Sequence, residues 1–547
     1  MSSKIVGTFV LALIGVAVQQ ATAQSFRVQC PASTITHPTA ANNNSEPAYT
    51  AATTFVSTHP AAPANGYLVP SAHVNGAIKC QQISGGDGYA SMGDGTQTYM
   101  FSFGPLSGLA DIASGNPGTE FPNTFNTTYP GTLVPGDPAT TPGFTFNGAV
   151  GLTPDLDCVS GNTIATAAGS ALPCPNLPAS GLDGHVDPRA IMDVGVMNGN
   201  IPAPLMAIDE DDEYFLTLTN VGMIMRPDLF EQHTVHFHGY PNASAFYDGV
   251  PDASVAINIG GSFTYYYLAP DAGTYFWHCH ITPPEHLQMG MVGQIYVRPR
   301  QNRVPATTSL YSALQVQQVD LRTACRRPND GVTPAVTSAT DILCTNPLPA
   351  VQTGLNGGGK YAYNDGDGST RYDVEYPIQI HGFDPNFHFV GMTFNPEGFA
   401  DMKDKYFLLN GRSYPDTVTP GSMETESADS VKHFSQPLPA IINITHGQKA
   451  LLRISDLDVT EYQTLASLGI PMQVVGYNAK LLRDQAGNNL YYTTNSITLA
   501  GGESLDVILD ATNNTTGQVF YLFTPQLDHL SNDAENFGGL MTEVHIN

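Results

Sequence analysis

Two short segments, 233–239 and 278–291, hold six of the chain's sixteen histidines, one of its seven cysteines and two methionines, side chains that can bind a soft metal ion. The second segment has the spacing Cys279-x6-His286-x4-Met291. Two imidazoles, one thiolate and a weak axial thioether form the ligand set of a blue-copper electron-transfer site. We expect His233 to supply the second imidazole. We prefer Met291 to Met289 as the axial ligand, because the loop must extend several residues to return along the metal axis.

The remaining histidines of these segments predict a second metal site. His236 and His238 alternate along one strand, so their side chains point the same way. His278 and His280 flank Cys279, and alternation turns both of them away from the side to which Cys279 points. The pattern therefore predicts four imidazoles on a second metal ion, one residue along the backbone from the blue site.

The N-terminus and the charge indicate an exported protein. Residues 1–23 have the pattern of a secretory signal, with Lys4, an apolar run over 5–18 and the small-residue site Ala21-Thr-Ala23. There is no second apolar run of spanning length, so we expect a soluble periplasmic or extracellular protein. The net charge of −27 argues against nucleic acid as a partner, since nucleic-acid binding needs clustered Lys and Arg.

Six of the seven cysteines are expected to form disulfides, because an even number in an exported chain is typical of a disulfide framework. Sequence alone leaves fifteen connectivities open for six cysteines. Proximity favours the pairs Cys30–Cys80, Cys158–Cys174 and Cys325–Cys344. The odd cysteine is then Cys279, which has a chemical role.

The pattern along the chain predicts an all-β fold with two domains. Short alternating runs separated by Gly- and Pro-rich turns indicate β-sandwich or Greek-key barrel domains. The clearest predicted strands are 98–104, 213–220, 262–267, 273–277, 406–416, 450–455 and 504–510. The predicted organisation is a signal (1–23), an irregular arm (24–95), a first domain (96–300) with an insertion (110–185), a linker (301–370) and a second domain (371–547). The two domains look like variations on one unit.

At this point a family resemblance can be stated. The segments His233-x-x-His236-x-His238-Gly239 and His278-Cys279-His280…His286…Met291 resemble those of the multicopper oxidases, a family of laccases, ascorbate oxidase and metal oxidases built from cupredoxin domains. The resemblance implies two cupredoxin-like domains. It implies a type 1 copper on His233, Cys279, His286 and Met291. It also implies a type 2/type 3 copper cluster on His236, His238, His278 and His280, where the family reduces oxygen to water. Cys279, His278 and His280 would carry electrons between the two sites.

The chain departs from the family pattern in three ways. The spacing from Cys279 to His286 is two residues longer than in laccases, and the copper-rich domain comes first. A complete cluster in this family uses eight histidines, of which four are accounted for. His529 is a further candidate ligand, because copper nitrite reductases place one second-domain histidine similarly and use it on a neighbouring subunit of a trimer. His381 and His388 are possible but match no motif. We interpret the other histidines as ordinary: His37, His59, His73, His185, His433, His446 and His545.

Three functions remain open on this evidence. The first is an exported copper oxidase that takes electrons from a phenolic or low-valent metal donor and passes them to O2. The second is a nitrite-reductase-like enzyme with a mononuclear copper on His238, His278 and His529, although His236 stands where those enzymes carry an acid. The third is a blue-copper electron-transfer or copper-binding protein whose cluster has degraded. A homotrimer is possible by analogy.

Overall fold

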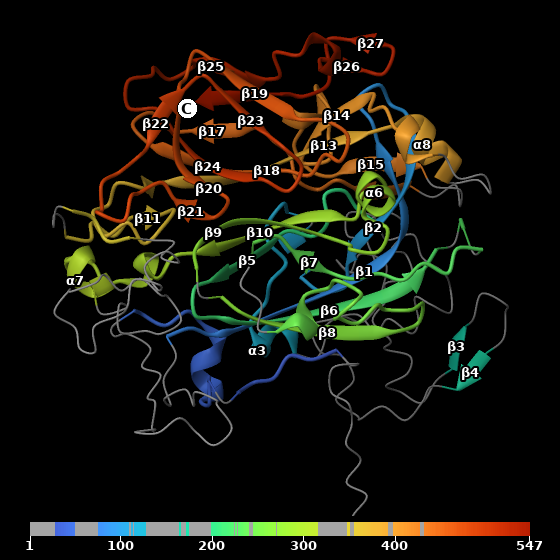
Figure 1. The fold of residues 1–547 in the computed structure, drawn as a ribbon, viewed down its shortest axis with the longest axis horizontal. Coiled ribbons are helices and arrows are strands. Elements are labelled where there is room, and N and C mark those ends of the chain that lie inside the picture. Colours follow the sequence, from blue (N-terminus) through green and yellow to red (C-terminus); the bar gives the residue numbers. More distant parts are fainter. Residues whose placement is uncertain are drawn as a thin grey trace, which may run out of the picture.

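The computed structural model contains two β-sandwich units with a few short helices, as the predicted all-β fold class requires (Figure 1). In the view of Figure 1 the second unit, coloured orange to red, lies above the blue-green first unit. The structure describes residues 28–34, 36–49, 75–108, 111–112, 114–126, 163–165, 171–173, 199–223, 225–226, 228–239, 244–269, 271–315, 347–350, 355–391, 398–426 and 432–547. Within these ranges no helix is long and apolar enough to cross a membrane.

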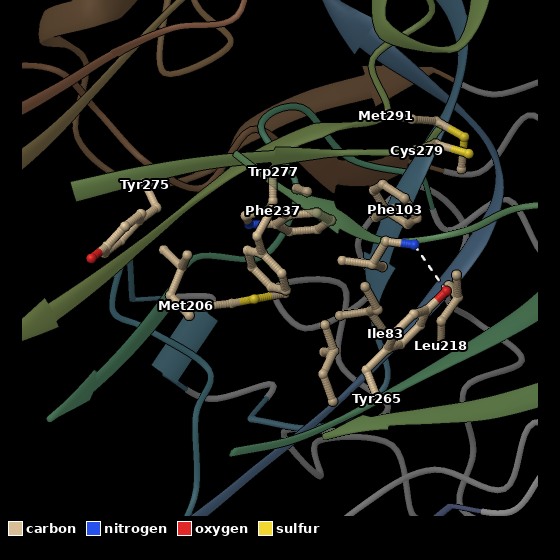
Figure 2. Packing of buried hydrophobic residues seen from close by; sticks show 14 of the residues in the cluster. Ile83, Phe103, Met206, Leu218, Phe237, Tyr265, Tyr275, Trp277, Cys279 and Met291 are labelled. Atoms are coloured by element: carbon tan, nitrogen blue, oxygen red, sulfur yellow. Dashed lines mark hydrogen bonds between the residues drawn. The ribbon is translucent and has the colours of Figure 1, made fainter. Parts of the chain in front are cut away.

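The first unit packs two four-stranded sheets face to face. The strands of one sheet, in spatial order, are β2 (Gln97–Pro105), β1 (Ile78–Ser91), β6 (Glu213–Gly222) and β8 (Ser262–Leu268). Those of the other are β5 (Met206–Asp209), β10 (Val292–Arg298), β9 (Gly273–His278) and β7 (His236–Phe237). Figure 2 shows the aromatic core between them, where Phe103, Phe237 and Trp277 pack together. Burial of such rings is the main force that holds the two sheets together.

The second unit has a larger sheet and a smaller one around an aliphatic core. The larger sheet contains β21 (Lys480–Leu481), β20 (Met472–Tyr477), β24 (Ser504–Asp510), β18 (Lys449–Asp456), β13 (Val374–Phe383), β14 (Tyr406–Leu409), β26 (Ser531–Asn532) and β27 (Glu535–Asn536), with β22 (Tyr492–Thr494) beside β20. The smaller contains β17 (Ile442–Ile444), β28 (Met541–Ile546), β25 (Val519–Phe523), β19 (Gln463–Leu468) and β23 (Ser496–Leu499).

The two units share one topology. The order β2-β1-β6-β8 in the first unit corresponds to β14-β13-β18-β24 in the second, and β1–β6 and β13–β18 are both parallel pairs. Likewise β5-β10-β9-β7 corresponds to β17-β28-β25-β19, and the first pair in each order is again parallel. The sequence-based expectation that the units are variations on one pattern is confirmed, strand by strand.

One part of the predicted arm is wrong. Residues 24–95 were expected to be irregular, but β1 is a 14-residue strand that pairs with β2 on one side and β6 on the other. Its glycines lower its strand propensity, which hides it in the sequence. Gly85 has a packing reason, because an added Cβ would lie 2.6 Å from the His233 ring.

The described part of the arm, 28–49, is fastened to the first unit. The predicted Cys30–Cys80 disulfide is present, and His37 pairs with Glu213 at 2.7 Å. The other two predicted disulfides lie outside the described residues, as do the signal segment and most of the insertion. Described elements of these regions are η2 (Ala40–Asn44), α3 (Pro122–Phe125), β3 (Thr163–Ala165) and β4 (Ala171–Pro173).

The predicted linker, 301–370, is packed where the structure describes it, and its role as a linker stays a prediction. Asp365 is fully buried and accepts hydrogen bonds from its own loop and from Gln301. A Gly/Asp-rich loop that satisfies its own backbone in this way carries no hydrophobic periodicity. The described elements here are η5 (Arg300–Arg303), α7 (Leu310–Gln315), β11 (Lys360–Tyr361) and β12 (Arg371–Tyr372). The domain boundaries themselves stay a prediction.

Buried polar contacts join the two units. Glu375 bonds to Arg298 of the first unit at 2.8 Å and to Arg453 of its own unit at 3.0 Å. The Gln436 side chain accepts from the backbone N–H of Ser91 and donates to its carbonyl, across 345 positions of the chain. The short elements of the second unit are α8 (Pro385–Gly391), η8 (Phe399–Asp401), η9 (Asp416–Val418), β15 (Met423–Glu426), β16 (Lys432–Ser435) and η10 (Leu527–His529).

Candidate copper centres

The structure brings His233, Cys279 and His286 together at one end of the first unit's core. Their potential ligand atoms all lie within 4.8 Å of one another, and all three side chains are fully buried. Cys279 directly follows β9, His233 forms an isolated bridge with Ile257, and His286 lies on α6 (Pro283–Gln288). We call this set the first group.

The loop that carries His286 is more structured than predicted. The sequence suggested an open loop between two strands, but Pro283 and Pro284 begin a short helix, α6, as proline favours at the first helical positions. His286 N–H donates to the Thr282 carbonyl, and the His286 ring packs edge-on against Phe101 at 5.1 Å. The two residues by which this spacing exceeds that of laccases are therefore accommodated by a turn of helix.

Met291 lies beside the first group, and Met289 does not. The Cys279 N–H donates to the Met291 carbonyl at 3.1 Å, and both side chains are fully buried at the same end of the core (Figure 2). The Met289 sulfur instead faces Gly391 of the second unit, at 3.3 Å from where a Cβ on that glycine would lie. This arrangement supports the choice of Met291 over Met289, and its role as axial ligand stays a proposal.

The donor atoms of the first group fit copper. Both ring nitrogens of His233 are buried without a hydrogen-bond partner, which is costly unless something else binds them. His286 Nδ1 lies 3.2 Å from the Cys279 sulfur, and its Nε2 faces Glu231 at 3.6 Å. Two imidazoles and a thiolate, dry and converging, are the donors that a blue copper site requires.

The pKa values in this group are strongly coupled. Burial opposes ionisation of Cys279, but the neighbouring His286 and His233 outweigh it and lower the pKa of the thiol well below its usual value. Burial likewise disfavours a charged His286, yet the Cys279 thiolate and Glu231 raise the pKa of this imidazole to about 9. The metal-free group is therefore a thiolate–imidazolium pair, which suits a site that binds a cation in place of a proton.

A second group, formed by His236, His238 and His278, lies on the opposite side of Cys279. Their potential ligand atoms lie within 4.8 Å of one another, and His236 and His278 are direct partners across β7 and β9. His236 Nδ1 lies 2.7 Å from the Asp248 carbonyl and His278 Nδ1 lies 2.6 Å from the Cys279 carbonyl. Each carbonyl thus holds one nitrogen of a ring and leaves Nε2 for a metal.

The third ring of the second group, His238, is held by the second unit. It bonds to the backbone of Gly502, where an added Cβ would lie 2.7 Å from His238 Nδ1. Its Nε2 lies 2.9 Å from His278 Nε2. Burial, with His236 and His280 nearby, lowers the pKa of His238 to about 4, so the ring is neutral and ready to bind a metal.

His280 is adjacent to this group but outside the tight set of three. Its ring centroid is 5.1 Å from that of His236 and 5.5 Å from that of His278. His236 and His238 line an open cleft between the units, and the cleft continues past His238 to Glu461, Tyr462 and Gly502 of the second unit. His236, His238 and His278 thus lie together with His280 beside them, and solvent reaches His236 and His238 through the cleft; that the four imidazoles bind a metal stays a prediction.

His529 joins neither group within one chain. Its Nδ1 lies 3.0 Å from the Gln463 side-chain oxygen, its Nε2 lies 3.3 Å from Glu461, and its ring stacks on Phe407 at 3.8 Å. His381 and His388 are buried and face backbone carbonyls, so they too lie outside both groups. Burial lowers the pKa of His388 to about 4, although carbonyls at both nitrogens favour its protonated form.

The shared topology explains where His529 sits. In the first unit Cys279 N–H donates to Met291, and Met291 N–H donates to the His286 carbonyl. In the second unit Thr524 N–H donates to Leu540, and Leu540 N–H donates to the His529 carbonyl. The ring partners also correspond: Phe101 with His286, and Phe407 with His529.

By these backbone bonds His529 is the counterpart of His286, and its role as a metal ligand stays a prediction. Its partner Gln463 pairs with Leu499 of β23. This pair corresponds to the bridge between His233 and Ile257 in the first unit. The second unit therefore has Gln463, Thr524, His529 and Leu540 where the first has His233, Cys279, His286 and Met291. The sequence contained a faint signal for this, a histidine followed by Gly539-Leu540 ahead of a strand, as Gly290-Met291 follows His286.

Comparisons with known proteins identify the family of the chain. Residues 333–542 match a multicopper oxidase family model, and residues 184–302 match a second one, so the two together cover more than half of the chain. A laccase of Aspergillus fumigatus is 31% identical over 137 residues, which are 25% of this chain and 21% of the laccase. A copper-containing nitrite reductase of Rhizobium meliloti is 35% identical over 109 residues, 19% of this chain and 26% of the reductase. The matches thus span only about a fifth to a quarter of these relatives.

Among solved structures, a blue copper oxidase from Nitrosomonas europaea matches 64% of this chain and 78% of its own, at 20% identity and a TM-score of 0.41. The copper nitrite reductase of the same organism matches 64% of this chain and 84% of its own, at 14% identity and a TM-score of 0.36. On the family models, with two groups of copper-type donors on a pair of β-sandwich units, the chain belongs to the multicopper oxidase family, whose cofactor is copper.

Proposed function

We propose that the protein is an exported, copper-dependent oxidoreductase that takes single electrons from a phenolic or low-valent metal donor and delivers them to O2. The observation that carries this proposal is the junction of the two groups: Cys279 of the first and His278 of the second are neighbours in the chain, and the His278 ring bonds to the Cys279 carbonyl. When bound, copper supplies one-electron chemistry at the first group and O2 reduction at the second. Four donors lose one electron each, and one O2 with four protons becomes two waters.

The residues divide this work between them. The type 1 copper would be held in a dry site by His233, Cys279, His286 and Met291. Electron donors would then bind at the surface beside the His286 ring, near Glu231. The short covalent path from Cys279 to His278 and His280 would carry electrons. His236, His238, His278 and His280 would hold the type 2/type 3 copper, in a cleft open enough to admit O2.

Four imidazoles are too few for a complete cluster. We propose that a second copy of the chain supplies the remaining ligands in a homo-oligomer, such as a trimer. The cleft beside His238 is rimmed by Tyr462, which is 69% exposed, and Leu527 and Phe537 of the same unit are more exposed still. Exposed apolar side chains of this kind mark contact surfaces. His529 would then act as a ligand only if a partner copy released it from Gln463 and Glu461.

The first test is copper per chain, with mass in solution and O2 uptake on the same sample. A value near four copper atoms, with O2 consumed when a phenol or ferrous ion is added, supports the oxidase. A value near two with nitrite turnover and no O2 uptake would favour the nitrite-reductase-like alternative. That alternative draws support from the tight set of three imidazoles, which suits a single ion. A blue protein with no turnover of either kind would contradict an enzymatic role.

A further inference from the structure

The segment that carries two of the proposed type 1 ligands, His286 and Met291, is short. α6 has only six residues, and its own backbone closes part of its end, since the Met289, Gly290 and Met291 N–H groups donate to the Glu285, Leu287 and His286 carbonyls. The segment turns at Gly290, in a left-handed conformation with φ of +114°. A helix this short also depends on what packs against its last carbonyls.

Two histidines of the second unit bind those carbonyls. His381, on β13, lies with its Nε2 2.9 Å from the Leu287 carbonyl. His388, on α8, lies with its Nε2 2.9 Å from the Gln288 carbonyl and its Nδ1 2.5 Å from the Tyr99 carbonyl of β2. Both rings are almost completely buried, and His388 stacks on Phe383 at 4.0 Å.

The side chains of the same turn are held as well. Gln288 donates to Asp404 at 2.9 Å and accepts from the Asp384 N–H at 2.9 Å, so both ends of its amide are fixed by the second unit. The Met289 sulfur lies against Gly391. The second unit thus contacts the Leu287 and Gln288 carbonyls and both ends of the Gln288 amide.

We propose that His381 and His388 are positioning residues for the type 1 copper site. The His381 ring donates from Nε2 to the Leu287 carbonyl, and the neutral His388 ring, with one N–H, lies between the Gln288 and Tyr99 carbonyls and donates to one of them. The two rings thereby fix where His286 and Met291 stand relative to Cys279. Partners that orient metal ligands change the affinity and the electronic properties of the metal, even though they do not touch it. The inference rests on the proposed function, since it assumes that the first group binds copper.

The decisive variant is His381→Leu/His388→Leu, which removes both caps. We expect copper affinity at the first group to fall by roughly tenfold, with a shifted thiolate-to-copper visible band and a changed reduction potential. The matched control is Gln294→Leu, because buried Gln294 donates two bonds across the same boundary, to Arg453 and Ser455, without touching α6. The control should lose thermal stability and keep the wild-type band and potential.

Hydrogen exchange on the metal-free protein supplies a readout without copper. Amides of 283–291 should exchange faster in the double variant and at the wild-type rate in Gln294→Leu. If the double variant does not fold, His381→Gln and His388→Gln keep one N–H donor each and should give smaller changes in the same direction. An unchanged band, potential and exchange rate in the folded variants would overturn the proposal. A wild-type protein with copper but no visible band would instead overturn the type 1 assignment itself.

Discussion

The two sandwich units place the same strands in the same order, yet within the described residues a convergent set of soft metal donors, His233, Cys279 and His286, occurs in the first unit alone. The positions of His233, Cys279 and Met291 in the first unit are taken in the second by Gln463, Thr524 and Leu540. His286 and its counterpart His529 are both histidines. Gln463 and His529 now hydrogen-bond to each other, which removes the unpartnered nitrogens that mark the first group. The shared topology therefore provides the positions for a metal site, and a few side chains decide whether those positions bind a metal.

The largest expected effect comes from Cys279→Ser. A hydroxyl replaces the thiolate, so the blue absorption band should vanish and copper per chain should fall by one, while the second group keeps its metal. Visible spectra with copper analysis would check this. A band that survived the substitution would show that the type 1 site lies elsewhere.

The reverse experiment is a gain of function in the second unit. Gln463→His, Thr524→Cys and Leu540→Met together should add about one copper per chain and a second thiolate-to-copper band, because His529 already occupies the place of His286. The same substitutions in a Cys279→Ser background would isolate the new band. Failure to bind copper in a folded variant would mean that the correspondence of backbone hydrogen bonds does not extend to the side chains.

One added atom at Gly502 should break the contact between the second unit and His238 of the second group. Gly502→Ala adds a Cβ 2.7 Å from His238 Nδ1, at a residue with φ of +91°, so the ring must move. We expect copper affinity of the second group to fall by roughly tenfold or more, with the blue band unchanged. Gly517→Ala is the control, because its φ is +90° and an added Cβ meets nothing within 4 Å. It should cost only ~1 kcal/mol of stability from the left-handed backbone. Equal copper loss in both variants would contradict the prediction.

The smallest expected effect is the number of protons that copper binding releases. A metal-binding imidazole must be neutral, and the His286 pKa of about 9 means that its ring is protonated at neutral pH in the metal-free protein. The Cys279 thiol, whose pKa is lowered, has already lost its proton. Copper binding to the first group should therefore release about one proton at neutral pH, and progressively less as the pH rises through about 9. His238 of the second group, whose pKa is about 4, should contribute no proton at neutral pH. Calorimetry in buffers of different ionisation enthalpy would measure both.

The sequence predicted the chemistry of the first unit better than its framework. Ligand spacing and strand alternation were enough to group His233, Cys279 and His286 and to turn His278 to the other side, because both depend on local geometry. β1 was missed because its glycines weaken the strand pattern, although Gly85 makes room for the His233 ring. His381, His388 and Gly502 act through contacts from the other unit, and such long-range contacts leave no periodic signal in one sequence.

The bond between Gln436 and Ser91 has a consequence for how the chain is made. The two residues are 345 positions apart, so β1 leaves the ribosome long before its second-unit partner exists. At synthesis rates of roughly 5–20 residues per second, that delay is on the order of tens of seconds. The first unit passes this interval with the surface that will meet β15 and β16 uncovered, so nascent chains of this protein should stay vulnerable to aggregation and proteases until the segment around residue 436 has left the ribosome.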